Sequence, residues 1–244
     1  MIDELLLIKT ANAITSTTGV DSIEHCMDVN RFKSWTKSVT YMYNYLGYRD
    51  NEWPEDLSNR TWCLGDSYTL GLGQAFEDTW PQLLSKKINN IVINVSMNGA
   101  SNDWIARRAV YILKTFQPES LLIQWSFLHR RETANTILPD EDRAIWYDTK
   151  DSKDLENFLK NLNLVEQVRG TCKIVHGFIP NFCDFNSTEK LHDKIYHHLN
   201  TNNIAYFTSL NQLDFARDGH HYDILTADAY ATNYYNTLNR LCLN

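Results

Sequence analysis

The chain alternates short apolar runs with longer segments in which apolar residues recur every three or four positions. The apolar runs lie at 61–65, 91–95, 120–125, 173–179 and 204–207. Helical spacing lies between and after them, at about 74–88, 102–115, 152–168, 187–200 and 226–241. Strands that alternate with helices build a parallel sheet with helices on both faces. The pattern therefore predicts a three-layer α/β/α fold around a five-stranded parallel sheet, with the last helix starting at an N-cap residue, Thr226.

Residues 1–59 fall outside this alternation and are rich in aromatic side chains. We predict two units, an N-terminal helical and aromatic extension over 1–59 and an α/β domain over 60–244. Aromatic residues most often fill cores, so the extension is expected to pack on the domain. The alternative is an aromatic surface for a ligand or partner, formed by residues such as Trp35, Tyr41, Tyr48 and Trp53.

Composition excludes several function classes. The net charge of −7 argues against non-specific nucleic-acid binding, and no apolar run is long enough for a membrane span. The start, with Asp3 and Glu4 before a short apolar stretch, is unlike a secretory signal, so a cytoplasmic location is expected. The five cysteines form no C-x-x-C pair, and His192 and His197 are poorly spaced for one helical face. We therefore expect no metal and no cofactor.

Residues with catalytic chemistry follow the predicted strands. Ser67 comes directly after the first apolar run, at Gly65-Asp66-Ser67, while Asp218 and His221 share a late loop. A serine nucleophile needs a histidine base, and the base needs an acceptor that fixes its tautomer. The alternatives are a simple β-turn at Gly65–Ser67 and a solvated salt bridge on the late loop. A glycine after the second run, Gly99, can offer its backbone amide closely to a ligand.

These segments resemble the sequence blocks of the SGNH (GDSL-type) hydrolases, a family of esterases and lipases. The first block matches Gly65-Asp66-Ser67 and continues through Gly71 and Gly73. The second matches Gly99, with Asn94 upstream, and the last, Asp-x-x-His, matches Asp218 and His221. The resemblance covers about residues 60–240 and implies the flavodoxin-like SGNH hydrolase fold.

The resemblance also implies roles for these residues. Ser67 would be the nucleophile, His221 the base in preference to its neighbour His220, and Asp218 the acid that orients it. The backbone amides of Ser67 and Gly99 would form an oxyanion hole. Asp66 is expected to make structural hydrogen bonds near the turn.

One block departs from the family pattern. The third block, Gly-x-Asn-Asp, places an asparagine donor in the oxyanion hole, but residues 120–126 hold no asparagine. Gln124 or Ser126 falls near the position and could donate instead, with Asn98 and Asn102 as further candidates. Losing one such donor costs about 10²–10³ in rate in a well-studied case.

Two function classes therefore stay open. The first is a serine esterase or acyl hydrolase that cleaves a carboxylic ester, possibly an O-acetyl group on a carbohydrate. The alternative is a catalytically weak or inactive SGNH-fold module that binds a glycan or a partner. The expected substrate is a small-molecule or glycan ester, and the oligomeric state is left open.

The segment 127–150 is long for a loop and follows the third apolar run. Such loops are usually functional or disordered. We predict that it covers the cleft and that Arg130 or Arg131 grips an anionic or polyhydroxylated substrate, since a guanidinium offers a rigid fork of donors. The alternative is a solvated loop whose arginines pair with Glu132, Asp140 or Glu141.

Overall fold

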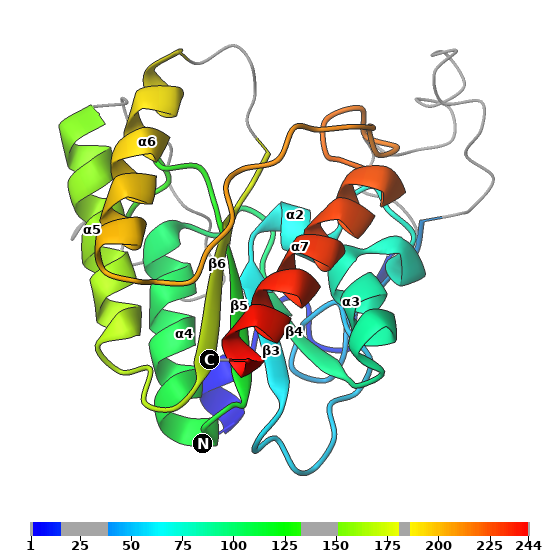
Figure 1. Cartoon of the computed structure of the whole chain (residues 1–244). Helices are drawn as coiled ribbons and strands as arrows, with labels where there is room; N and C mark the ends of the chain where they lie inside the picture. The colour runs from blue at the N-terminus through cyan, green and yellow to red at the C-terminus, as the bar shows by residue number, and fades with distance from the viewer. Residues whose placement is uncertain (1, 16–38, 133–150, 181–185, 244) are drawn as a thin grey trace.

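The computed structural model describes residues 2–15, 39–132, 151–180 and 186–243. Its centre is a parallel sheet of four strands in the order β4-β3-β5-β6. The strands are β3 (Thr61–Gly65), β4 (Val92–Ser96), β5 (Ser120–Trp125) and β6 (Lys173–Phe178). Figure 1 shows α4 (Asn102–Phe116), α5 (Asp151–Glu166) and α6 (Asn186–Thr201) on one side, with α3 (Trp80–Ile88) and α7 (Ile224–Cys242) on the other. The predicted three-layer α/β/α fold is confirmed.

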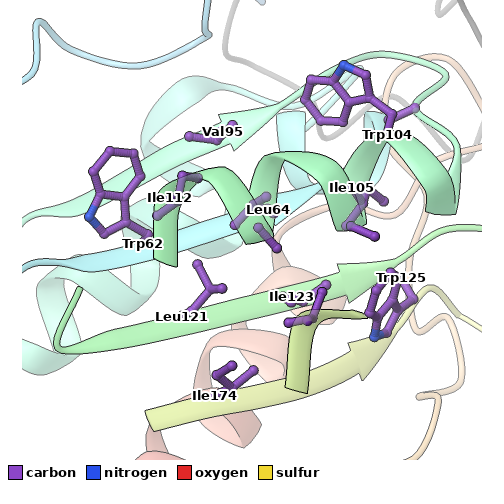
Figure 2. Packing of buried hydrophobic residues seen from close by; sticks show 14 of the residues in the cluster. Trp62, Leu64, Val95, Trp104, Ile105, Ile112, Leu121, Ile123, Trp125 and Ile174 are labelled. Carbon is purple, nitrogen blue, oxygen red and sulfur yellow. The ribbon is translucent and has the colours of Figure 1, made fainter. Parts of the chain in front are cut away.

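The strands are buried on both faces, as parallel sheets require. Alternate strand residues enter two apolar clusters, so that Leu64 and Ile123 face α4 while Cys63 and Leu122 face α7. Figure 2 shows the first cluster, in which strand residues pack against the buried face of α4. No helix within the described ranges is long and apolar enough to cross a membrane.

The prediction of a fifth strand at 204–207 was wrong. The segment makes a single parallel bridge, Tyr206 with His176, outside the four described strands of the sheet. His176 exchanges backbone hydrogen bonds with Ala205 (3.0 Å) and Phe207 (3.1 Å). These two bonds hold the segment at the edge of β6 without extending it into a strand.

Two helix starts also differ from the prediction. The segment 74–88 divides into the short 3₁₀ helix η3 (Phe76–Asp78) and α3, separated by the extended residue Thr79. The second helix begins at Trp80, and Pro81, whose fixed φ suits the first turn, follows directly. Helix α7 begins at Ile224, and Thr226 is not its N-cap. The carboxylate of Asp214 performs the capping, because it accepts the amides of residues 223, 225 and 226.

The N-terminal region packs on the domain through apolar side chains. Its described regular elements are η1 (Ile2–Leu5) and the antiparallel pair β1 (Ile14–Thr15) and β2 (Tyr41–Met42). Six of its residues join the large cluster beside α4: Leu5, Leu7, Leu46, Tyr48, Trp53 and Leu57. Trp35 lies outside the described residues. The division of the chain at residue 59 stays a prediction.

Candidate active site

Ser67 lies where β3 ends and the one-turn helix α2 (Ser67–Leu70) begins. Asp66 caps this helix, because its Oδ1 accepts the amide of Tyr68 at 3.0 Å, which confirms the structural role expected for Asp66. The turn requires glycine at position 65, since a Cβ there would lie 2.0 Å from Oγ1 of Thr69. The turn thus presents the serine at the carboxyl end of the sheet, where α/β proteins bind ligands.

His221 connects Ser67 to Asp218. Its Nε2 lies 2.8 Å from Oγ of Ser67, and its Nδ1 contacts Oδ2 of Asp218. Oδ1 of Asp218 accepts the backbone amides of His220 and His221, each at 2.9 Å. The structure therefore brings Ser67 together with Asp218 and His221, which lie more than 150 positions later in the sequence.

The carboxylate of Asp218 is suited to remain ionised. Burial acts to raise its pKa, but the hydrogen bond and charge of His221, together with the two amide bonds, outweigh that effect and lower the pKa. An ionised acceptor at Nδ1 keeps the proton of neutral His221 on that nitrogen. Nε2 then carries the lone pair that faces the hydroxyl of Ser67. This arrangement can remove the serine proton.

The neighbouring His220 is less suited to this task. Burial and the adjacent charge of His221 lower its pKa, and its ring packs edge-on against His221, with centroids 5.2 Å apart. The choice of His221 over His220 agrees with the Nε2–Oγ contact.

Gly99 lies on the neighbouring turn, after β4. Its φ of +77° falls in the region that favours glycine. The amide of Met97 donates to the carbonyl of Gly65 at 3.2 Å and thereby holds the two turns together. The amide of Ser67 is the first of α2, so the helix itself offers it no acceptor. Both backbone donors expected from the sequence therefore belong to adjacent turns at one edge of the sheet.

Solved structures with the same architecture are esterases and related hydrolases. A G-D-S-L family lipolytic protein from Desulfitobacterium hafniense matches at a TM-score of 0.54 and 13% identity, over 74% of this chain and 99% of that one. The esterase EstA from Pseudoalteromonas matches at 0.52 and 17%, over 77% and 100%. A family two carbohydrate esterase from Clostridium thermocellum, in complex with cellohexaose, matches at 0.56 and 14%, over 78% and 67%.

The chain has the fold of the SGNH hydrolases. No protein-family model matches it, and no curated protein matches its sequence significantly. The identities are low enough that the likeness concerns the fold. What the site can do has to be argued from its own residues.

The side-chain amide of Gln124 is hydrogen-bonded by three other side chains. Its Oε1 accepts Oγ1 of Thr69 (2.7 Å) and Nε1 of Trp80 (3.2 Å), and its Nε2 lies 3.3 Å from the hydroxyl of Tyr222. Side chains alternate along a strand, so Gln124 points towards the face covered by α3 and α7. Its amide is engaged there, which counts against the predicted role as an oxyanion donor. It instead holds Tyr222, the residue after His221.

Ser126 is also engaged. Its hydroxyl donates to Oδ2 of Asp66 at 2.6 Å, and Nη1 of Arg130 lies 3.2 Å from the same hydroxyl oxygen. A serine hydroxyl has one proton to donate, so this arrangement counts against Ser126 as an oxyanion donor. Nη1 of Arg130 also lies 3.1 Å from Oδ2 of Asp66 in a buried ion pair. Sequence reasoning missed this network, because Asp66 and Arg130 are 64 positions apart and no local pattern joins them.

The two arginines predicted to bind substrate are both held by carboxylates. Arg130 pairs with Asp66, and Nε of Arg131 donates to Asp154 on α5 at 2.8 Å. Glu132 bonds instead to Arg107 and Ser101 on the α4 side. These ion pairs count against the predicted role of either arginine in binding substrate. Residues 133–150, including Asp140 and Glu141, lie outside the described residues, so the predicted cover over the cleft stays a prediction.

Asn102, one of the further donor candidates, ties α4 to the end of β5. Its Oδ1 accepts the amide of Ser126 (2.9 Å), and its Nδ2 donates to the carbonyl of Phe127 (3.1 Å). This side chain is therefore committed to structure.

Aromatic rings surround the serine and histidine. The ring of Tyr68 lies 4.5 Å from that of His221 and 6.4 Å from Phe127, and Phe127 stacks on His129 at 5.4 Å. The guanidinium of Arg130 lies over Phe127 at 4.7 Å. Burial, the largest cause, raises the pKa of Tyr68, so its phenol remains neutral. The surroundings of the nucleophile are thus aromatic and include the buried cation of Arg130.

Proposed function

We propose that this protein is a serine esterase or acyl hydrolase that cleaves a carboxylic ester. The observation that carries the proposal is the 2.8 Å contact from Nε2 of His221 to Oγ of Ser67, with Nδ1 held by Asp218. A solvated salt bridge on the late loop would give no reason for that contact. The fold supports the proposal, because esterases share it.

In this mechanism Ser67 attacks the ester carbonyl while His221 accepts the hydroxyl proton. The tetrahedral intermediate collapses, the C–O bond to the alcohol breaks, and His221 returns the proton to the leaving oxygen. Water then attacks the acyl-serine with His221 again as base, which releases the acid and regenerates Ser67. Asp218 stabilises the imidazolium in both steps.

The oxyanion would be held by the backbone amides of Ser67 and Gly99. Gln124 and Ser126 are engaged elsewhere, so we propose no third side-chain donor. Arg130 contributes differently. Its charge neutralises Asp66 beside the nucleophile, and an unpaired carboxylate there would oppose the developing negative charge.

The proposed substrate is an ester of a small molecule or a glycan, possibly an O-acetyl group on a carbohydrate. One fold relative is a carbohydrate esterase in complex with cellohexaose. The half-buried rings of Phe127 and His129 offer apolar faces of the kind that pack against other planar or apolar surfaces. One observation favours the alternative, a binding module with little turnover: residues 120–126 hold no asparagine donor.

A fluorophosphonate probe tests the proposal, because it reacts with activated serines. The wild-type protein should label covalently, and Ser67→Ala should not, while hydrolysis of p-nitrophenyl acetate should be lost in parallel. Ser126→Ala is a matched control, a serine of the same site that we do not assign as nucleophile, and should still label. A folded wild-type protein that neither labels nor hydrolyses acyl esters would contradict the esterase and support the binding module.

A further inference from the structure

We propose that Arg49, in the N-terminal region, is a positioning residue. It fixes the turn that carries Ser67 (residues 66–74) relative to the loop that carries Asp218 and His221 (residues 214–222). This inference rests on the proposed function and adds the N-terminal region to the catalytic apparatus. Arg49 is fully buried, and it lies before the segment that resembles SGNH hydrolases.

The guanidinium of Arg49 binds the end of the helix that begins at Ser67. Nη1 donates to the carbonyls of Leu70 (3.1 Å) and Gly71 (2.5 Å), and Nη2 donates to that of Gln74 (2.8 Å). The carbonyls at a helix end have no intrahelical donor, and a cation there also suits the helix dipole. Asp66 caps the start of this one-turn helix and Arg49 caps its end.

A second group from the same region contacts the same turn. The hydroxyl of Tyr41 accepts the amide of Gly73 at 2.8 Å, and the guanidinium of Arg49 lies 4.4 Å from the centre of the Tyr41 ring. Tyr41 also packs with Leu70 and Leu72 in a small apolar cluster. Arg49 and Tyr41 together therefore fix the backbone from residue 70 to residue 74.

The far side of this turn touches the loop that carries the catalytic acid. The carbonyl of Gly73 accepts the amide of Arg217 at 3.3 Å. A Cβ on Gly73 would lie 2.9 Å from Cβ of Ala216 and 3.2 Å from the amide nitrogen of Asp218. With φ at +78° and this close approach, the position requires glycine. A shift of the turn would be passed to Asp218.

Small displacements of the catalytic groups lower the rate strongly. Arg49 holds the turn that sets Ser67, and the same turn supports the loop that sets His221. A misplacement of about 1 Å between reacting groups can cost about 10² in rate. Because Arg49 is buried behind the turn, its loss should affect turnover more than substrate binding.

The test compares Arg49→Met with Arg108→Met. Arg108 is also buried and also joins the N-terminal region to the domain, because it donates to the carbonyl of Glu4. Its guanidinium lies over the ring of Trp104 on its own helix. It lies on α4, which follows the Gly99 turn rather than the turn after Ser67. For Arg49→Met we expect kcat on p-nitrophenyl acetate to fall by about 10–100-fold with KM within about twofold. Arg49→Lys should recover part of the loss, and Arg108→Met should leave kcat within about twofold.

Hydrogen exchange supplies a readout that needs no activity. Arg49→Met should speed amide exchange in both 66–74 and 214–222, whereas Arg108→Met should speed neither. If Arg49→Met fails to fold, Tyr41→Phe removes only the hydroxyl that binds Gly73 and should give a smaller change of the same kind. Unchanged kcat and exchange in a folded Arg49→Met protein, or equal losses in Arg108→Met, would overturn the proposal. A wild-type protein that fails to label contradicts the esterase alone, because the exchange comparison still tests Arg49.

Discussion

Two histidines of this protein each bond a carboxylate, and only one of them can act as a base. His221 contacts Asp218 on the late loop, and His176 on β6 contacts Glu166 at the end of α5, with Nε2 to Oε1 at 2.9 Å. In both pairs, hydrogen bonds and charge lower the pKa of the carboxyl group despite its burial, which acts in the opposite direction. The acid–histidine pair alone therefore does not distinguish a catalytic site from a structural one.

The two pairs differ in their third partner, the group that contacts the second ring nitrogen of the histidine. The second nitrogen of His221 faces the hydroxyl of Ser67, which can give up a proton. The second nitrogen of His176, Nδ1, accepts Nε1–H of Trp125 at 3.0 Å, and an indole N–H is a donor only. Trp125 thereby occupies the lone pair that a base would need. His176 is also fully buried in the sheet, whereas His221 lies at its carboxyl edge.

The largest loss of activity is expected when Ser67 or His221, the proposed catalytic pair, is removed. Ser67→Ala and His221→Ala should each lower kcat by about 10⁴–10⁶-fold, because residues of a triad act as a unit. Both proteins should remain folded, as judged by circular dichroism and thermal unfolding. The double variant should lose no more activity than either single one. Activity retained by Ser67→Ala would contradict the assigned nucleophile.

The two carboxylates should then separate in their effects on turnover. Asp218→Asn should lower kcat by about 10²–10⁴-fold, because the amide favours the wrong tautomer of His221. Glu166→Gln, the matched substitution in the other pair, should leave kcat within about twofold. Steady-state kinetics on p-nitrophenyl acetate measure both. Equal losses in the two variants would mean that the third partner does not determine which pair is catalytic.

Trp125→Phe tests whether the pair of His176 and Glu166 contributes to stability rather than to turnover. The substitution removes the indole N–H that His176 accepts and leaves a buried nitrogen without its donor, which should cost about 1–3 kcal/mol in the free energy of unfolding. Turnover should be unchanged. Urea unfolding measures the cost, and Tyr234→Phe, which alters another buried aromatic residue outside both pairs, provides the control. A fall in kcat without a loss of stability would place Trp125 in the catalytic apparatus instead.

The sequence predicts what depends on local patterns. Apolar periodicity reveals the layers of the fold, and the positions of Ser67, Asp218 and His221 after predicted strands anticipate their meeting at one edge. Side-chain alternation along β5 could also have shown that Gln124 points to the face opposite α4, because Ile123 and Trp125 face α4.

The remaining contacts join residues that are distant in the sequence, and no local pattern marks them. Asp66 and Arg130 are 64 positions apart, and Arg49 binds carbonyls more than 20 positions away. The cap of α7 comes from Asp214 rather than from the helix's own first residues. Each of these partners is selected by tertiary packing, which determines which buried group needs compensation.

The smallest expected effect concerns the pH dependence of stability. The pKa of Glu166 is lowered from an ordinary value of 4.5, since the hydrogen bond and charge of His176 and the charge of Arg169 outweigh burial. The unfolded chain therefore binds a proton at this group before the folded one does. The contribution of Glu166 is fully present above about pH 4.5 and is lost as the pH falls through its folded pKa.

Glu166→Gln should accordingly flatten the acid side of the stability profile, by no more than about 1.4 kcal/mol per pH unit. Urea unfolding from pH 6 to pH 3 measures this slope. Glu119→Gln is the control, because Glu119 forms an exposed ion pair with Lys173, which lies on β6 as His176 does, and such pairs contribute little. An unchanged slope in Glu166→Gln would mean that the structural pair is not held by charge. His176 would then be held in the sheet by Trp125 and packing alone, and the two histidine–carboxylate pairs would differ in strength as well as in their third partner.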